Sequence, residues 1–198
     1  PAARVPWSQP LRTTMSFVLG TSSTASEAPA DAPSHHLDVV GYDRTADRLV
    51  LREQIGDDPA IAVYSVMPVA GPSAGTAIPL AHGTRAALRP LVPVEAADLH
   101  GWELTTRVIQ RRGLRVFGDL APIRKFALAL TVQHRVGGLA IAQGRAVTTA
   151  YLRPRATLAS VWTVPGRPIA VALVSYCGVP TGIGVDKQVA ILAAPSWH

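Results

Sequence analysis

Apolar and polar positions alternate along the first half of the chain in a way that predicts β-strands. The stretches LDVVGY and RLVLRE, residues 37–42 and 48–53, flank a polar turn that contains Asp43 and Asp47. This pattern predicts a β-hairpin. The segment AIAVYSVMPVA, residues 60–70, is apolar at most positions and rich in β-branched residues, which predicts a strand buried on both faces.

Two later segments have spacings typical of helices. Residues 77–88 place apolar side chains at helical intervals before Arg89-Pro90, which acts as a stop. Residues 122–138, PIRKFALALTVQHRVGG, have closely spaced apolar positions and end in Gly-Gly, which predicts a buried helix with a C-terminal stop. Further strands are expected at 103–117, 138–143 and 159–164, and residues 166–176 fit a strand or a helix. The mixture predicts an α+β fold.

Composition limits the range of partners and compartments. The chain has 198 residues, is 48% hydrophobic and carries a single cysteine, Cys177. No apolar run is long enough to span a membrane, and residues 1–19 lack the order of a secretory signal. We therefore expect a cytoplasmic protein without membrane contact. The scattered histidines and the lone cysteine predict no metal or other cofactor.

The net charge of +6 comes mostly from arginine, because Lys125 and Lys187 are the only lysines. The basic residues are spread along the chain with one local cluster, RVIQRRGLR at 107–115, and aromatic residues do not interleave with them. A solvated basic surface is the simpler interpretation, so nucleic acid is not the expected partner.

The pentapeptide Gly71-Pro72-Ser73-Ala74-Gly75 raises a choice between a turn and a nucleophile. Small residues on both sides of Ser73 would expose its hydroxyl, and a helix beginning after it would aim amide groups at a developing oxyanion. A strand, GxSxG and helix in succession also fit the nucleophile elbow of α/β-hydrolases. That elbow needs a later Asp and His, and Asp98 or Asp119 with His134 have no distinctive spacing.

The motif GPSAGTA, residues 71–77, resembles the catalytic-serine motif of Lon-type proteases, which use a Ser/Lys dyad. Residues 118–138, GDLAPIRKFALALTVQHRVGG, are similar to the family segment in which Pro-Ile leads into the helix that carries the lysine. Residues 39–53 and 159–176 resemble the opening hairpin and the last strand and helix. The closest likeness is to the polyprotein-processing proteases of birnaviruses.

The resemblance implies a Lon-like α+β domain at 37–176, with an N-terminal arm and linker at 1–36 and an extension at 177–198. It further implies a serine endopeptidase in which Ser73 is acylated, while Gly71, Pro72, Ala74 and Gly75 bind the oxyanion and substrate. The substrate would be a peptide or polyprotein with small residues near the scissile bond, processed in the host cytoplasm if the protein is viral. No cofactor is implied.

The position that matches the dyad lysine is Ala129. Three explanations stay open. Lys125, one helical turn earlier, could act as the base; the lysine could have been replaced by design; or the domain could be a naturally inactive relative.

Two other functions remain as alternatives. Many short strands and an N-terminal arm suit an all-β viral coat or structural protein of jelly-roll type. A non-catalytic Lon-like domain could instead bind nucleic acid through arginines. A helix at 122–138 would favour the protease, and a strand there would favour the coat protein.

Overall fold

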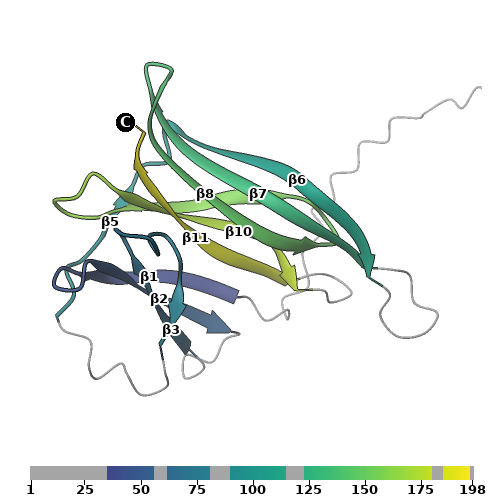
Figure 1. Ribbon diagram of the computed structural model, residues 1–198, viewed down its shortest axis with the longest axis horizontal. Helices are drawn as coiled ribbons and strands as arrows, with labels where there is room; N and C mark the ends of the chain where they lie inside the picture. The colour runs from purple at the N-terminus through teal and green to yellow at the C-terminus, as the bar shows by residue number, and fades with distance from the viewer. Residues whose placement is uncertain (1–34, 56–61, 81–89, 115–122, 180–184, 197–198) are drawn as a thin grey trace, which may run out of the picture. The chain divides into compact units, whose positions relative to one another are not determined.

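The computed structural model describes residues 35–55, 62–80, 90–114, 123–179 and 185–196 (Figure 1). All of them belong to one compact unit, Asp31–His198. Throughout this described part the regular elements are β-strands, and the fold is all-β. The α+β prediction is therefore wrong, and its all-β alternative gives the correct class.

The smaller sheet is an antiparallel meander of four strands. It contains β1 (His35–Asp43), β2 (Arg48–Ile55), β3 (Ala62–Pro68) and the short β4 (Ile78–Pro79), in that order. The hairpin expected at 37–53 is confirmed, since β1 pairs with β2 from His35↔Ile55 to Asp43↔Arg48. The strand expected at 60–70 is confirmed as β3, but its expected burial on both faces is not, because only Val66 and Met67 within it are buried.

The larger sheet has seven strands in the order β5-β9-β10-β11-β8-β7-β6. Their bounds are β5 (Glu95–Ala97), β6 (Trp102–Leu114), β7 (Ile123–Val136), β8 (Leu139–Tyr151), β9 (Ala156–Thr163), β10 (Ala170–Val179) and β11 (Val185–Pro195). Strands β8 to β11 have a Greek-key order, because β11 returns to lie beside β8. A jelly roll combines two Greek keys, and the described strands of the smaller sheet form a meander instead.

The helix expected at 122–138 is the strand β7, which is the main correction to the sequence analysis. Phe126, Leu128, Leu130 and Val132 are buried, whereas the residues between them are only half-buried. This is the two-residue period of a strand with one face in the core. Alanines on the other face hid the alternation, because an alanine counts as apolar wherever it lies.

The two glycines after β7 form a turn and not a helix stop. Gly137 and Gly138 have φ angles of 58° and 84° and connect β7 to β8, the backbone that a two-residue hairpin turn requires. The helix expected at 77–88 is also wrong where it is described, because Ile78–Pro79 pairs with β3 as β4. The remainder of that segment, 81–89, lies outside the described residues.

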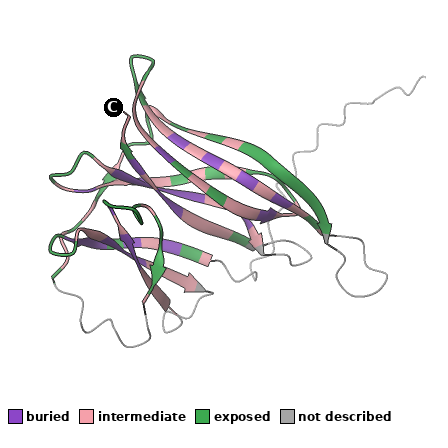
Figure 2. Ribbon diagram, in the orientation of Figure 1, coloured by how far each residue is buried: buried purple, intermediate pink, exposed green. Residues whose placement is uncertain are grey.

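Two apolar clusters form the core, and both contain residues of β10 (Figure 2). Val171 and Leu173 pack with residues of β1, β2 and β3, including Leu37, Leu49 and Met67. The alternate residues of β10 pack against β7, β9 and β11; these are Ala170, Ala172 and Val174. Strand β10 is therefore a middle layer buried on both faces, which explains the unbroken apolar run that fitted either a strand or a helix.

A polar network closes the β1–β2 hairpin. The Asp43 carboxylate, 4% exposed, accepts hydrogen bonds from the amides of Thr45 and Ala46, both at 3.1 Å, and from Arg48 Nε at 3.2 Å. Burial alone would raise the pKa of Asp43, but the bonds from Ala46, Arg48 and Thr45 outweigh it and hold the pKa below its usual value.

The same hairpin is tied to the β9–β10 connection through Arg167. Its guanidinium forms an ion pair with Asp47 and donates to the Tyr42 hydroxyl at 3.2 Å, while Tyr42 donates to Asp47. The hydrogen bonds from Arg167 and then Tyr42 lower the pKa of Asp47. Burial, followed by the Asp47 contact, raises the pKa of Tyr42.

Strands β8 and β11 approach closely at Gly144. A Cβ atom there would lie 2.3 Å from the carbonyl oxygen of Leu192 and 2.8 Å from Ile191 Cγ2. Only glycine fits at this point without a shift of one strand.

Candidate functional site

The GPSAGTA segment forms an exposed turn after β3. Gly71 and Gly75 have φ angles of 85° and 78°, which favour glycine. The amide of Ala74 donates to Gly71 O at 3.1 Å, that of Gly75 to Pro68 O at 2.9 Å, and that of Thr76 to Ser73 O at 3.0 Å. These three amides are therefore engaged within the turn and are not directed at an oxyanion position.

The other residues of the expected dyad lie on a strand of the larger sheet. In the strand register, Lys125 lies opposite Arg112 on β6 and Tyr151 on β8, and Ala129 lies opposite Arg107 and Val147. Ser73 is exposed on the turn after β3. Between these described residues no hydrogen bond joins Ser73 to Lys125, and the two hollows described below that contain Ala74 or Ala129 do not include Ser73 in their linings.

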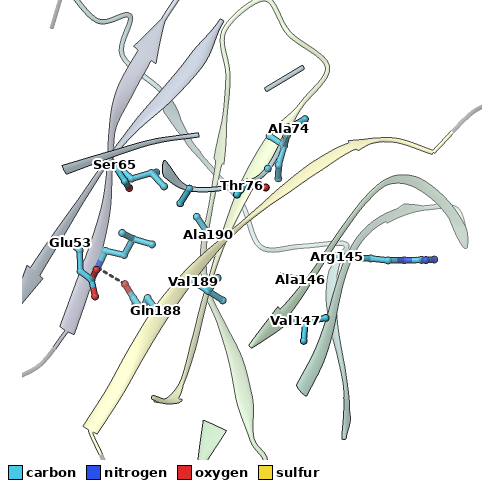
Figure 3. A pocket seen from close by; sticks show the side chains of 15 residues that line it. Glu53, Ser65, Ala74, Thr76, Arg145, Ala146, Val147, Gln188, Val189 and Ala190 are labelled. Atoms are coloured by element: carbon cyan, nitrogen blue, oxygen red, sulfur yellow. Dashed lines mark hydrogen bonds between the residues drawn. The ribbon is translucent and has the colours of Figure 1, made fainter. Parts of the chain in front are cut away.

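The first hollow lies between the turn, β2, β8 and β11, and has a volume of about 480 Å³. Figure 3 shows Ala74 and Thr76 at its rim, with Glu53 and Gln188 on the facing strands. Glu53 contacts His35 at 3.3 Å and Lys187 at 3.6 Å. Gln188 accepts from the amide of Leu37 at 2.9 Å and donates to Ser175 at 3.1 Å. These polar side chains are thus used to join β1, β2, β10 and β11.

The second hollow lies on the sheet formed by β6, β7 and β8, and has a volume of about 580 Å³. Its lining is Thr105, Arg107, Ala129, Leu130, Thr131, Arg145, Ala146 and Val147. Ala129 forms the centre, because it pairs with Arg107 on one side and Val147 on the other. Thr131 likewise pairs with Thr105 and Arg145.

Four cationic side chains share the face of these strands that carries the hollow. Side chains alternate between the two faces of a strand, and the face opposite to Leu128 and Leu130 contains Ala129, Thr131 and their partners. We call this surface the basic face. It consists of Glu103, Thr105, Arg107, Gln110, Arg112, Lys125, Ala127, Ala129, Thr131, Gln133, Gln143, Arg145, Val147, Thr149 and Tyr151.

Acidic side chains are engaged elsewhere in the described part of the chain. Glu103 lies at the end of the same face, but it pairs with Arg135 at 3.2 Å. Asp38, Asp43, Asp47, Glu53 and Asp186 also form ion pairs with other residues. Within the described ranges, no acidic group lies at ion-pair distance from the four cations of the basic face.

Two glutamines hold two of these arginines in place. In the amide orientation that satisfies both partners, the Gln143 oxygen accepts from Nε and Nη2 of Arg145, both at 2.8 Å. The Gln110 oxygen accepts from Nη2 and Nε of Arg112 at 2.9 and 3.0 Å. Each guanidinium keeps three of its five N–H donors for a ligand.

The sequence analysis did not identify this surface. It found the arginine cluster at 107–115, but Lys125, Arg145 and the two threonines lie on other strands, and only the pairing register brings them together. The segment QGRAV alternates the polar Gln143 and Arg145 with the small Gly144 and Ala146, a pattern that could have indicated a polar strand face.

Neither a metal site nor a membrane-spanning helix is found among the residues that the structure describes. Those residues contain no group of three potential metal-binding side chains, and they include no helix long and apolar enough to cross a membrane. No family model, curated protein or solved structure matches the chain.

Proposed function

We propose that the protein is a non-catalytic binding protein that contacts a nucleic acid through the basic face. The observation that supports this proposal is the arrangement of Arg107, Arg112, Lys125 and Arg145 on one sheet face, without acidic partners among the described residues. A phosphate backbone supplies the missing negative charge.

The composition of the face favours nucleic acid over other polyanions. Arginine binds phosphate through two parallel hydrogen bonds, and the threonine and glutamine side chains add donors and acceptors. From Lys125 to Thr131, β7 extends about 20 Å, which accommodates several nucleotides. Tyr151 lies beside Lys125 and provides a ring on which a base can stack.

Two hypotheses from the sequence, a structural protein and a serine endopeptidase, differ in how well they agree with this proposal. A structural protein that contacts nucleic acid is compatible with it, and the strand β7 favours that alternative. Serine endopeptidase activity stays a prediction that no observation here favours, since the helix on which it depended is a strand. Ser73 lies in the turn between β3 and β4 of the smaller sheet, and Lys125 lies on β7 of the larger sheet. A reducing, cytoplasmic compartment belongs to the proposal, in keeping with a chain whose single cysteine, Cys177, is buried.

The test is binding of the full chain to a fluorescent single-stranded RNA of about 15 nucleotides. We expect the double variant Arg107→Ala/Arg145→Ala to bind at least about tenfold more weakly, and each lost phosphate contact to reduce the slope of log affinity against log salt by about 0.7. Arg44→Ala/Arg155→Ala is the matched control, because it removes the same charge from exposed positions outside the basic face. Equal weakening by both double variants would contradict the proposal, as would RNA binding that neither changes.

A further inference from the structure

We infer that the hollow over Ala129 is the seat of a single phosphate group, held between Arg107 and Arg145. This inference rests on the proposed function and makes it more specific, because it assigns one phosphate of the nucleic acid to one place on the basic face.

The two arginines approach the seat from opposite sides. Arg107 on β6 pairs directly with Ala129 on β7, and Arg145 on β8 pairs with Thr131, two residues further along β7. Two strand spacings separate β6 from β8, about 9.5 Å. Both arginines are exposed and both line the hollow, so an anion above β7 is within reach of two guanidinium groups.

The base of the hollow is small and apolar at its centre. Ala129 presents one methyl group where a larger side chain would occupy the space. Beside it, Val147 is 70% exposed and forms part of the wall. The volume of about 580 Å³ exceeds that of a phosphate and leaves room for the attached sugar.

Two threonines in the lining of the hollow offer further hydrogen-bond donors. Thr105 and Thr131 are direct partners across β6 and β7, and each carries a hydroxyl group that can donate to a phosphate oxygen. Gln143 accepts hydrogen bonds from Nε and Nη2 of Arg145, which leaves three N–H donors of that guanidinium for a ligand.

The seat differs from the general attraction of the basic face because it depends on an uncharged residue. Ala129→Leu places three further carbon atoms at the centre of the hollow without changing any charge, so electrostatic attraction to the polyanion stays the same. Ala129→Ser is the matched control, because a serine preserves the space. Circular dichroism and thermal unfolding verify that both variants fold as the parent chain does.

The experiment measures RNA affinity by fluorescence anisotropy, with inorganic phosphate as a competitor at constant ionic strength. We expect Ala129→Leu to weaken RNA binding on the order of tenfold, the effect of losing hydrogen bonds to a charged group, and to abolish competition by phosphate. Ala129→Ser should retain both properties.

The remaining outcomes separate this inference from the proposed function. If Ala129→Leu binds RNA and responds to phosphate as the parent does, the seat is overturned and the basic face still binds nucleic acid. If RNA does not bind but phosphate shifts the NMR signals of Thr131 and Val147, two other lining residues, in the parent and not in Ala129→Leu, the seat stands and the proposed function fails. If neither ligand binds, both are overturned.

Discussion

The Asp43 carboxylate closes the first hairpin, and its removal tests how much one buried charge contributes. Asp43→Ala leaves the amides of Thr45 and Ala46 and the Arg48 guanidinium without their acceptor. We expect a loss of about 2–4 kcal/mol in the free energy of unfolding, measured by urea denaturation. Asp186→Ala is the control, because its pair with Arg153 is exposed and should contribute less than about 1 kcal/mol. Similar losses in both variants would refute this role.

The lowered pKa values of Asp43 and Asp47 predict a loss of stability in acid. A carboxyl whose pKa is lower in the folded state stabilises the fold above its unfolded pKa, about 3.9, and this contribution disappears as the pH falls through the folded value. We therefore expect the free energy of unfolding to fall steeply below about pH 4.

The comparison is with Asp43→Asn/Asp47→Asn, measured by denaturation across the same pH range. This variant should be less stable at neutral pH and show a shallower decline in acid. Parallel declines for the parent and the variant would exclude these two carboxylates as the cause.

Residue chemistry could be predicted from the sequence only in part. The motif around Ser73 left a turn and a nucleophile as alternatives, and the structure forms a turn there in which Gly71 and Gly75 have φ angles of 85° and 78°. The partners of Ala129 could not be predicted, because Arg107 and Val147 are assigned to it by the register of two strand pairs. Long-range register depends on the complete set of packed side chains.

At the scale of elements, the close contact between β8 and β11 depends on Gly144. Gly144→Ala places a methyl group against the Leu192 carbonyl, which must separate the strands at a cost of about 1–3 kcal/mol. The measurement is the midpoint of chemical denaturation. Gly137→Asn is the control, because its turn has open space around it and a positive φ that asparagine tolerates. A stable Gly144→Ala with a destabilised Gly137→Asn would contradict this explanation.

Elements were predicted well where their pattern was local and poorly where alanines obscured it. The β1–β2 hairpin has clear alternation and a polar turn, so its position was correct. In β7 the partly buried residues include Ala127 and Ala129, and these made a two-residue period look like a continuous apolar helix. A residue scale that ignores alanine would have favoured a strand.

At the scale of the whole molecule, β10 couples the two apolar clusters. Leu173→Ala removes a side chain that is 3% exposed and packs with the smaller sheet, so we expect a loss of about 2–5 kcal/mol. Amides in both β2 and β7 should lose protection together in native-state hydrogen exchange, because β10 contributes to both clusters. Retained protection in β7 alone would indicate two independent units.

The arrangement of the sheets could not be predicted from the sequence. Hairpins join neighbours in the chain, but the contact between β8 and β11 and the packing of β10 against β1–β3 connect distant segments. Nothing in a local pattern specifies such contacts. The long apolar run of β10 fitted a strand or a helix and did not indicate the layers that cover it.

The position of β10 also has a consequence for synthesis on the ribosome. The hairpins of the smaller sheet can form soon after their residues emerge, but their apolar face is completed by Val164, Val171, Leu173 and Ala190. At roughly 5–20 residues per second, that face waits several seconds for the strands that cover it. A nascent chain arrested before β10 should therefore bind ribosome-associated chaperones that recognise exposed apolar segments. The chaperone should be released once β11 has emerged.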